Sequence, residues 1–263
     1  GALLLVVALA RPAARAQLEE EVEGIDILLC LDTSSSMTAD DMERRRTRLA
    51  IARDAAIDFV RGREQDRVGL LTFARYPDVR CPLTRDHAML EEILRDVTTV
   101  SGEGPEDATG IGTAVARAAQ VLERSGAASK VVILLTDGDE NVAQAGVQGE
   151  IAPAHAAQLC ERLGVKVYAI AAGSGRPDPG GTWRRPDTRT LEALASRTAG
   201  VFLAATDADA LAGVYAQVDA LERTFFAEPR PVFSDRYLSF VIAALIALLL
   251  GALLATTVLE VQP

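Results

Sequence analysis

Three short polar segments of this chain carry side chains that could bind a hard metal ion. The first, DTSSSM, has a D-x-S-x-S spacing; the second, EDATG, precedes a stretch of helical period; the third, TDG, follows a run of aliphatic residues. Carboxylate and hydroxyl oxygens suit Mg²⁺, Mn²⁺ or Ca²⁺, and no Cys or His lies among them to favour a softer metal. We therefore predict a divalent-cation site, with Mg²⁺ as the first choice, formed by Asp32, Ser34, Ser36, Thr109 and Asp137.

The mixture of neutral and charged oxygens indicates how such a site would act. The D-x-S-x-S spacing places the Asp32 carboxylate and the Ser34 and Ser36 hydroxyls on one side of an extended turn. If the hydroxyls bind directly and the aspartates hold waters, the cation stays electrophilic and keeps one open position. A carboxylate from another molecule can fill that position. The expected activity is therefore binding of a ligand that carries a carboxylate.

The elements before and after these segments must bring them together. Apolar runs of strand length recur along the chain, at 25–31, 68–74, 131–135, 165–171 and 201–205. Stretches with helical spacing of apolar residues lie at 47–61, 87–97, 111–124, 153–163, 190–198 and 208–223. Strands covered on both faces become continuous apolar runs. This order predicts an α/β, Rossmann-like fold with helices on both faces of a doubly wound, mostly parallel sheet.

One predicted strand breaks the parallel pattern. Residues 79–83 follow the strand at 68–74 after a link that is too short for a helical crossover. We expect an antiparallel edge strand there, where Pro82 is tolerated because an edge position needs no N–H donor. In the rest of the sheet, the polar segments gather at the carboxyl ends of the strands, where open α/β sheets bind their ligands.

With these residues in this order, the sequence resembles the von Willebrand factor A domain and its metal-ion-dependent adhesion site. The resemblance rests on D-x-S-x-S, on a separate Thr before a helix and on T-D-G after a buried strand, and it extends over essentially all of residues 25–226. It implies that the two serines and the threonine bind the metal directly and that the aspartates bind mainly through water. It also implies a protein-binding module that is not an enzyme.

Further short matches narrow this resemblance. The chain is similar to the bacterial Bat (Bacteroides aerotolerance-type) membrane proteins in DRVGL at 66–70, CPLT at 81–84, ATDA at 205–208 and LERT at 221–224. The resemblance implies an inner-membrane protein with a periplasmic domain, in an envelope stress or aerotolerance complex with other Bat-type proteins and a MoxR-type AAA+ ATPase. The loop at 173–186 departs from the pattern, and we assign it no role.

Apolar segments lie at both ends of the chain. Residues 237–259 contain no charge, and about 20 such residues are enough for a helix to cross a bilayer, so we expect a transmembrane helix there. The apolar run at 2–10 is too short to span; we interpret it as the end of an upstream transmembrane helix, with a signal-peptide core as the alternative. The expected organisation is an upstream helix end, a linker, one von Willebrand A domain, a juxtamembrane linker and a transmembrane helix, over 1–11, 12–24, 25–226, 227–236 and 237–259.

Composition excludes several other classes of protein. Of the 263 residues, 49% are apolar and 24% are charged, which is typical of a folded domain. The formal net charge of −10 argues against nucleic-acid binding, which needs a basic face to displace counterions. Cys30, Cys81 and Cys160 are too scattered for a disulfide framework or a zinc site, and we expect them to be buried apolar residues.

Two alternative functions would use the same residues. A Mg²⁺-dependent phosphohydrolase could use Asp32 as a nucleophile, but Ser34 stands where such chemistry normally needs a second acid. The sequence also contains no Walker A or G-x-S-x-G motif. The other alternative is a structural membrane protein with a vestigial metal site, and the oxygen ligands retained at all five positions argue against it.

Overall fold

The computed structural model of the chain divides into two compact units. One comprises Val22–Phe225, and the other comprises Gly1–Glu21 together with Phe226–Pro263. The residues that the structure describes are 13–16, 24–102, 104–138, 140–142, 150–173, 175–177, 183–184, 187–225, 232–235 and 237–258.

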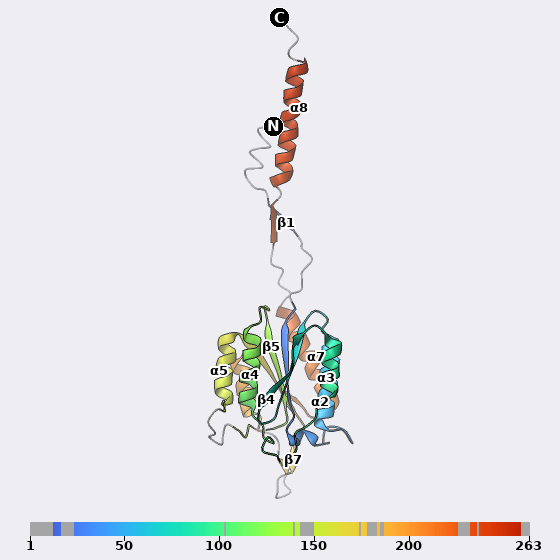
Figure 1. The fold of residues 1–263 in the computed structure, drawn as a ribbon, viewed down its shortest axis with the longest axis vertical. Coiled ribbons are helices and arrows are strands. Elements are labelled where there is room, and N and C mark those ends of the chain that lie inside the picture. Colours follow the sequence, from blue (N-terminus) through green and yellow to red (C-terminus); the bar gives the residue numbers. More distant parts are fainter. Residues whose placement is uncertain are drawn as a thin grey trace. The chain divides into compact units, whose positions relative to one another are not determined.

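The first unit is built on a six-stranded sheet in the order β4-β3-β2-β5-β6-β9 (Figure 1). Five of its strands are parallel to one another: β2 (Asp26–Asp32), β3 (Arg67–Phe73), β5 (Lys130–Thr136), β6 (Val165–Ala172) and β9 (Phe202–Ala205). The edge strand β4 (Pro77–Thr84) runs antiparallel to β3. The prediction of a mostly parallel sheet with one antiparallel edge strand is confirmed.

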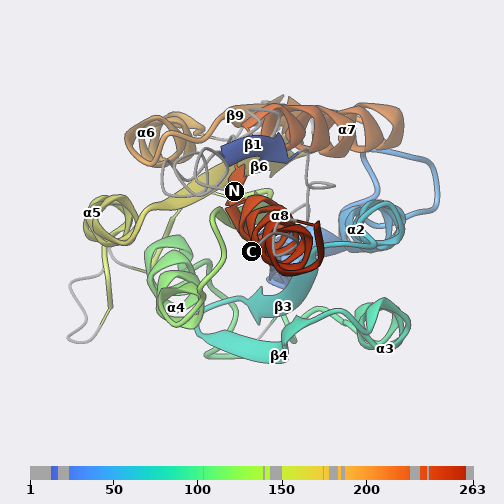
Figure 2. The ribbon, with the colours of Figure 1, turned by 90° about the horizontal axis from the view of Figure 1, so that it is seen from above.

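Helices cover both faces of this sheet (Figure 2). One face carries α4 (Ile111–Glu123), α5 (Pro153–Leu163) and α6 (Arg189–Arg197), and the other carries α2 (Arg48–Arg61), α3 (His87–Arg95) and α7 (Ala208–Phe225). Because both faces are covered, every residue of β2 is buried, and this burial explains its continuous apolar sequence. The fold is therefore the doubly wound α/β arrangement.

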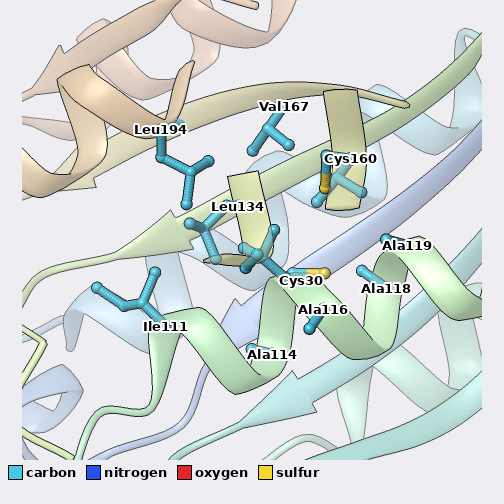
Figure 3. Close-up of a cluster of buried hydrophobic side chains, with 14 of the residues drawn as sticks. Cys30, Ile111, Ala114, Ala116, Ala118, Ala119, Leu134, Cys160, Val167 and Leu194 are labelled. Carbon is cyan, nitrogen blue, oxygen red and sulfur yellow. The ribbon is translucent and has the colours of Figure 1, made fainter. Parts of the chain in front are cut away.

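Small side chains on α4 let this helix lie close to the sheet. Ala114 and Ala118 are completely buried against residues such as Leu134 of β5 (Figure 3). A Cβ atom on Gly112 would lie 2.0 Å from the carbonyl oxygen of Ile151, so only glycine fits the backbone contact there. This packing fixes the start of α4, and with it the polar segment that precedes the helix.

The three cysteines are free and buried, as expected from the sequence. Cys30 and Cys160 lie in the same apolar cluster between the sheet and the helices (Figure 3). Burial raises the pKa of the Cys160 thiol to about 12 and raises that of Cys30 as well. Both thiols therefore stay protonated at neutral pH and contribute to the core as small apolar groups.

The described residues of the second unit form a short strand pair and one helix. Strand β1 (Ala13–Ala16) pairs antiparallel with β10 (Val232–Asp235), in segments that were predicted to be linkers. The pairing of these strands gives hydrogen-bond partners to backbone groups that would otherwise be bound by water. The two strands have four residues each and lie far apart in the sequence, so no sequence pattern marked them as partners. Helix α8 (Tyr237–Val258) occupies most of the expected transmembrane segment. Judged over the described residues alone, no helix of the structure is both long and apolar enough to be assigned as a membrane span.

Candidate metal centre

The predicted ligands meet where the strand order reverses. Asp32 is the last residue of β2, and Asp137 directly follows β5, the strand that pairs with β2. From β2 the chain passes outward to β3 and β4, whereas from β5 it passes outward to β6 and β9 on the other side. Ligands of open α/β sheets bind at such a switch point, outside the carboxyl ends of the strands.

Asp32 is held at the base of this centre. Its side chain is inaccessible to solvent, with Oδ1 accepting the N–H of Ser34 (2.8 Å) and Oδ2 accepting the Thr136 hydroxyl (2.5 Å). The Ser34 contact shapes the turn that leads into the single 3₁₀ turn η1 (Ser35–Thr38). Thr136 was not among the predicted ligands, although it stands immediately before Asp137.

A line of hydroxyl groups joins the two aspartates. The Ser34 and Ser36 hydroxyls are hydrogen-bonded to each other (Oγ to Oγ, 3.0 Å), and the Ser36 hydroxyl donates to Oδ1 of Asp137 (2.6 Å). Neither Ser34 nor any other side chain caps η1. The two serine hydroxyls therefore form hydrogen bonds within the cluster of oxygens and do not cap the local turn.

Thr109 reaches the same place from the segment before α4. Its N–H donates to Oδ1 of Asn141 (2.8 Å), and the Asn141 N–H donates back to the Thr109 carbonyl (3.2 Å). A Cβ atom on Gly138 would lie 3.5 Å from the Thr109 hydroxyl oxygen, so this hydroxyl lies against the TDG turn. Helix α4 has Gly110 as its N-cap and no side-chain cap, so Thr109 does not cap it. The structure thus brings all five predicted residues together.

The carboxylate of Asp32 lies in an environment that disfavours its charged form. Burial and the nearby Asp137 carboxylate raise the pKa of Asp32 to about 7, against the lowering effect of the hydrogen bonds from Thr136 and Ser34. Two neighbouring carboxylates removed from water repel each other, and a divalent cation would relieve that repulsion. Among the described residues, no group of three or more His, Cys, Asp and Glu could hold a metal by itself. A cation here would depend on the hydroxyl ligands, which agrees with the donor set expected for Mg²⁺.

Other acidic residues near the centre bind backbone or side-chain partners. Asp107 accepts the N–H and the hydroxyl of Ser35 (2.9 and 2.7 Å), and so joins the Thr109 segment to the serine turn. Glu140 accepts the N–H of Gly112 (2.9 Å) in the first turn of α4, where a negative charge is favoured by the helix dipole. Asp139, two residues after Asp137, lies outside the described residues.

Asp41 forms a bidentate ion pair with Arg48, the first residue of α2. Arg48 also donates to Asp137, and its side chain is only 4% exposed. Sequence reasoning missed Arg48 because it lies in a run of arginines, TADDMERRRTR, that reads as a solvated surface segment.

The fold and the site together place the chain among α/β domains with a hydroxyl-rich cluster at the switch point of the sheet. Residues 27–140 match the family described as von Willebrand factor type A domain. The matched residues include all five predicted ligands. A curated relative, an uncharacterized protein of Borreliella burgdorferi, is 28% identical over 219 residues, which are 78% of this chain and 61% of the relative. The chain thus spans about three fifths of that relative's length.

Solved structures with the same fold include two from Bacteroides. The hypothetical protein BatB of Bacteroides thetaiotaomicron is 20% identical with a TM-score of 0.61, over 76% of this chain and 100% of that one. An aerotolerance-related membrane protein of Bacteroides fragilis is 22% identical with a TM-score of 0.59, over 74% and 98%. Proximal thread matrix protein 1 from the mussel byssus, solved with a zinc-occupied adhesion motif, is 24% identical with a TM-score of 0.57, over 84% and 50%.

Proposed function

We propose that this chain is a metal-dependent protein-binding module in which a divalent cation, held by the five-residue centre, receives a carboxylate from a protein partner. The observation that carries the proposal is the line of hydroxyls from Ser34 through Ser36 to Asp137, set beside the buried carboxylate of Asp32. Neutral hydroxyl ligands leave the charge of the cation largely uncompensated. The cation would then supply an electrophilic position for an Asp or Glu of the partner.

The donor set fits a hard divalent cation, with Mg²⁺ favoured and Mn²⁺ or Ca²⁺ as alternatives. Asp32, Ser34, Ser36, Thr109 and Asp137 would hold it. The zinc in the corresponding motif of the mussel protein supports a cation at this place in the fold, and its softer character makes zinc the competitor to test.

A binding module accounts for Asp32 better than a phosphohydrolase does. A carboxylate nucleophile must reach a phosphoryl group, but Asp32 is 0% exposed and both of its oxygens accept hydrogen bonds. The residue two positions later is Ser34, so no second acid is placed to assist. These features support a non-enzymatic role.

We further propose that the chain belongs to a Bat-type assembly of a bacterial inner membrane, with the domain on the periplasmic side. Helix α8 contains no charged residue, and Leu245 and Leu249 on it are more than half exposed, which supports contact with a bilayer. The structural likeness to an aerotolerance-related membrane protein supports the same environment. The partners would be other Bat-type proteins and a MoxR-type AAA+ ATPase, and the spanning role of 237–259 stays a prediction.

Calorimetric titration of the purified full chain with Mg²⁺, Mn²⁺ and Zn²⁺ tests the proposed function. The wild-type chain should bind, and the double variant Ser34→Ala/Ser36→Ala should not, with an unchanged far-ultraviolet circular dichroism spectrum because the sheet below does not need the metal. Ser196→Ala is the matched control, since that exposed hydroxyl only contacts the Ala193 carbonyl within α6. No binding by the wild-type chain in the millimolar range would refute the proposal.

A further inference from the structure

Arg48 is a buried, positively charged residue at the edge of the candidate metal centre. It is not one of the five predicted ligands. Its Nε and Nη2 atoms donate to the two carboxylate oxygens of Asp41, at 2.6 and 2.7 Å. Nη1 donates to Oδ2 of Asp137 at 2.5 Å, and Nη2 also donates to the Gly175 carbonyl at 2.8 Å. One planar group therefore joins α2, the turn after β2, the turn after β5 and the loop after β6.

The loop after β6 closes against the guanidinium. A Cβ atom on Gly173 would lie 2.5 Å from Nε and 2.6 Å from Cζ of Arg48, and this glycine has φ of +103°, which other residues rarely adopt. A side chain at position 173 would collide with the guanidinium, so glycine at this position lets the backbone lie close to Arg48.

The orientation of Asp137 depends on this contact. Its side chain is inaccessible to solvent, and its two oxygens have different donors: Ser36 on Oδ1 and Arg48 on Oδ2. The two-donor fork of the guanidinium binds both carboxylate oxygens of Asp41, which fixes the direction of Nη1, and Nη1 donates to a single oxygen of Asp137. The ammonium of lysine has no such planar fork and could not hold both contacts in the same geometry. With Oδ2 held by Arg48, the oxygen that faces the serine hydroxyls is Oδ1.

Two effects of Arg48 on metal binding have opposite signs. As a positive charge beside the site, it would weaken the binding of a cation, because like charges at a few ångströms repel strongly where water is excluded. As a fixed donor, it would strengthen binding by holding Asp137 in the orientation that the site needs. The four hydrogen bonds of Arg48 and the close approach of Gly173 favour the second effect, since a charge that acted only at a distance would need none of them.

We propose that Arg48 is a positioning residue of the metal centre, which orients the Asp137 carboxylate through Nη1 and is itself held by Asp41 and by the backbone at Gly173 and Gly175. This inference rests on the proposed function. Residues that orient metal ligands commonly change metal affinity by about 10- to 100-fold when replaced. Arg48→Lys and Arg48→Met should therefore both weaken metal binding by about tenfold or more.

Titration of the full chain with Mn²⁺ separates position from charge. If Arg48 acted only through its charge, Arg48→Lys would bind as the wild type does and Arg48→Met would bind more tightly. If it acts by position, both variants lose affinity, and water-proton relaxation of the bound Mn²⁺ changes in Arg48→Lys because a reoriented Asp137 alters the water held on the ion. Arg46→Gln is the matched control: Arg46 lies two residues away and pairs with Glu43 and Asp54 at the surface.

Loss of Arg48 could also unfold the chain, so a milder variant is included. Asp41→Asn removes the charge that holds the guanidinium, while Arg48 and Asp137 themselves are not substituted. This variant should weaken Mn²⁺ binding less than Arg48→Lys does. Wild-type affinity and relaxation in both Arg48→Lys and Asp41→Asn would overturn the role of Arg48 while leaving the proposed function intact. A wild-type chain that does not bind Mn²⁺, Mg²⁺ or Zn²⁺ would instead overturn the proposed function.

Discussion

Replacement of Glu222 tests how the last helix of the domain is attached to the sheet. Glu222 lies on α7, and its side chain is 1% exposed. Its carboxylate accepts hydrogen bonds from Lys166 (2.9 and 3.2 Å), from the Tyr168 hydroxyl (2.6 Å) and from the Ser129 hydroxyl (3.0 Å). Burial and the Glu222 charge raise the pKa of Tyr168, so its hydroxyl stays protonated and donates at every pH of interest.

The expected cost follows from what each substitution leaves behind. Glu222→Gln keeps the shape of the side chain but replaces the ion pair with Lys166 by a contact to a neutral amide. Because the Lys166 side chain is 21% exposed, its ammonium can turn to water, and the free energy of unfolding should fall by about 1.5–3 kcal/mol. Glu222→Ala also leaves the buried hydroxyls of Tyr168 and Ser129 without an acceptor. We expect a loss of about 3–5 kcal/mol for that variant, as for other broken buried pairs.

Urea unfolding of the full chain, followed by circular dichroism, measures both losses. A decrease of that size in Glu222→Ala corresponds to a fall of roughly 6–20 °C in Tm for a domain of this length. Arg197→Gln is a suitable control, since the Arg197 to Glu161 ion pair is exposed at both ends and should contribute little. A loss below about 1 kcal/mol in Glu222→Ala would mean that the buried network does not hold α7, and the reasoning would fail.

Three other predictions concern the partner, the membrane and the core. Binding of a native membrane partner should disappear with EDTA and in the variants Asp32→Ala and Thr109→Ala. As the salt concentration rises, binding should weaken little or improve, because salt screens the repulsion between an acidic partner and a chain of charge −10. Pull-downs at low and high salt measure this, and a partner that is retained after EDTA would contradict the prediction. Protease added outside spheroplasts should cut the domain, and full protection would reverse the periplasmic assignment. Iodoacetamide at pH 8 should label none of the three thiols in the folded chain and all three in urea. Burial raises the pKa of Cys30, Cys81 and Cys160, so the reactive thiolate forms are suppressed in the folded chain. Rapid labelling of the folded chain would show that the core opens.

The positions of most elements could be predicted because both faces of the sheet are covered. A strand such as β5 appears in the sequence as an uninterrupted aliphatic run, and the expected 131–135 differs from Lys130–Thr136 only at its ends. The end of α7 was harder to place: the helix continues two residues beyond the expected 208–223. Helix ends depend on local backbone contacts that the apolar pattern does not contain.

The candidate site was predictable only in part, for a related reason. Its ligands stand beside strand ends, so the fold and the residue types were enough to group Asp32 with Asp137. Arg48 is 89 residues away from Asp137, and nothing in its own segment distinguishes it from the exposed arginines before it. A buried ion pair is a property of tertiary structure, and its two halves give no joint signal in one sequence.

The two edges of the sheet differ from its interior in a way that affects how copies of this domain would meet. The outer strand β4 carries Pro77 and Pro82 and shifts register twice against β3, and the opposite edge strand β9 has only four residues. Proline removes an N–H from the free edge, and a four-residue strand presents few backbone groups. The edge strands of two copies of this domain therefore offer each other few backbone groups for hydrogen bonding. We expect copies at high concentration not to join their sheets edge to edge.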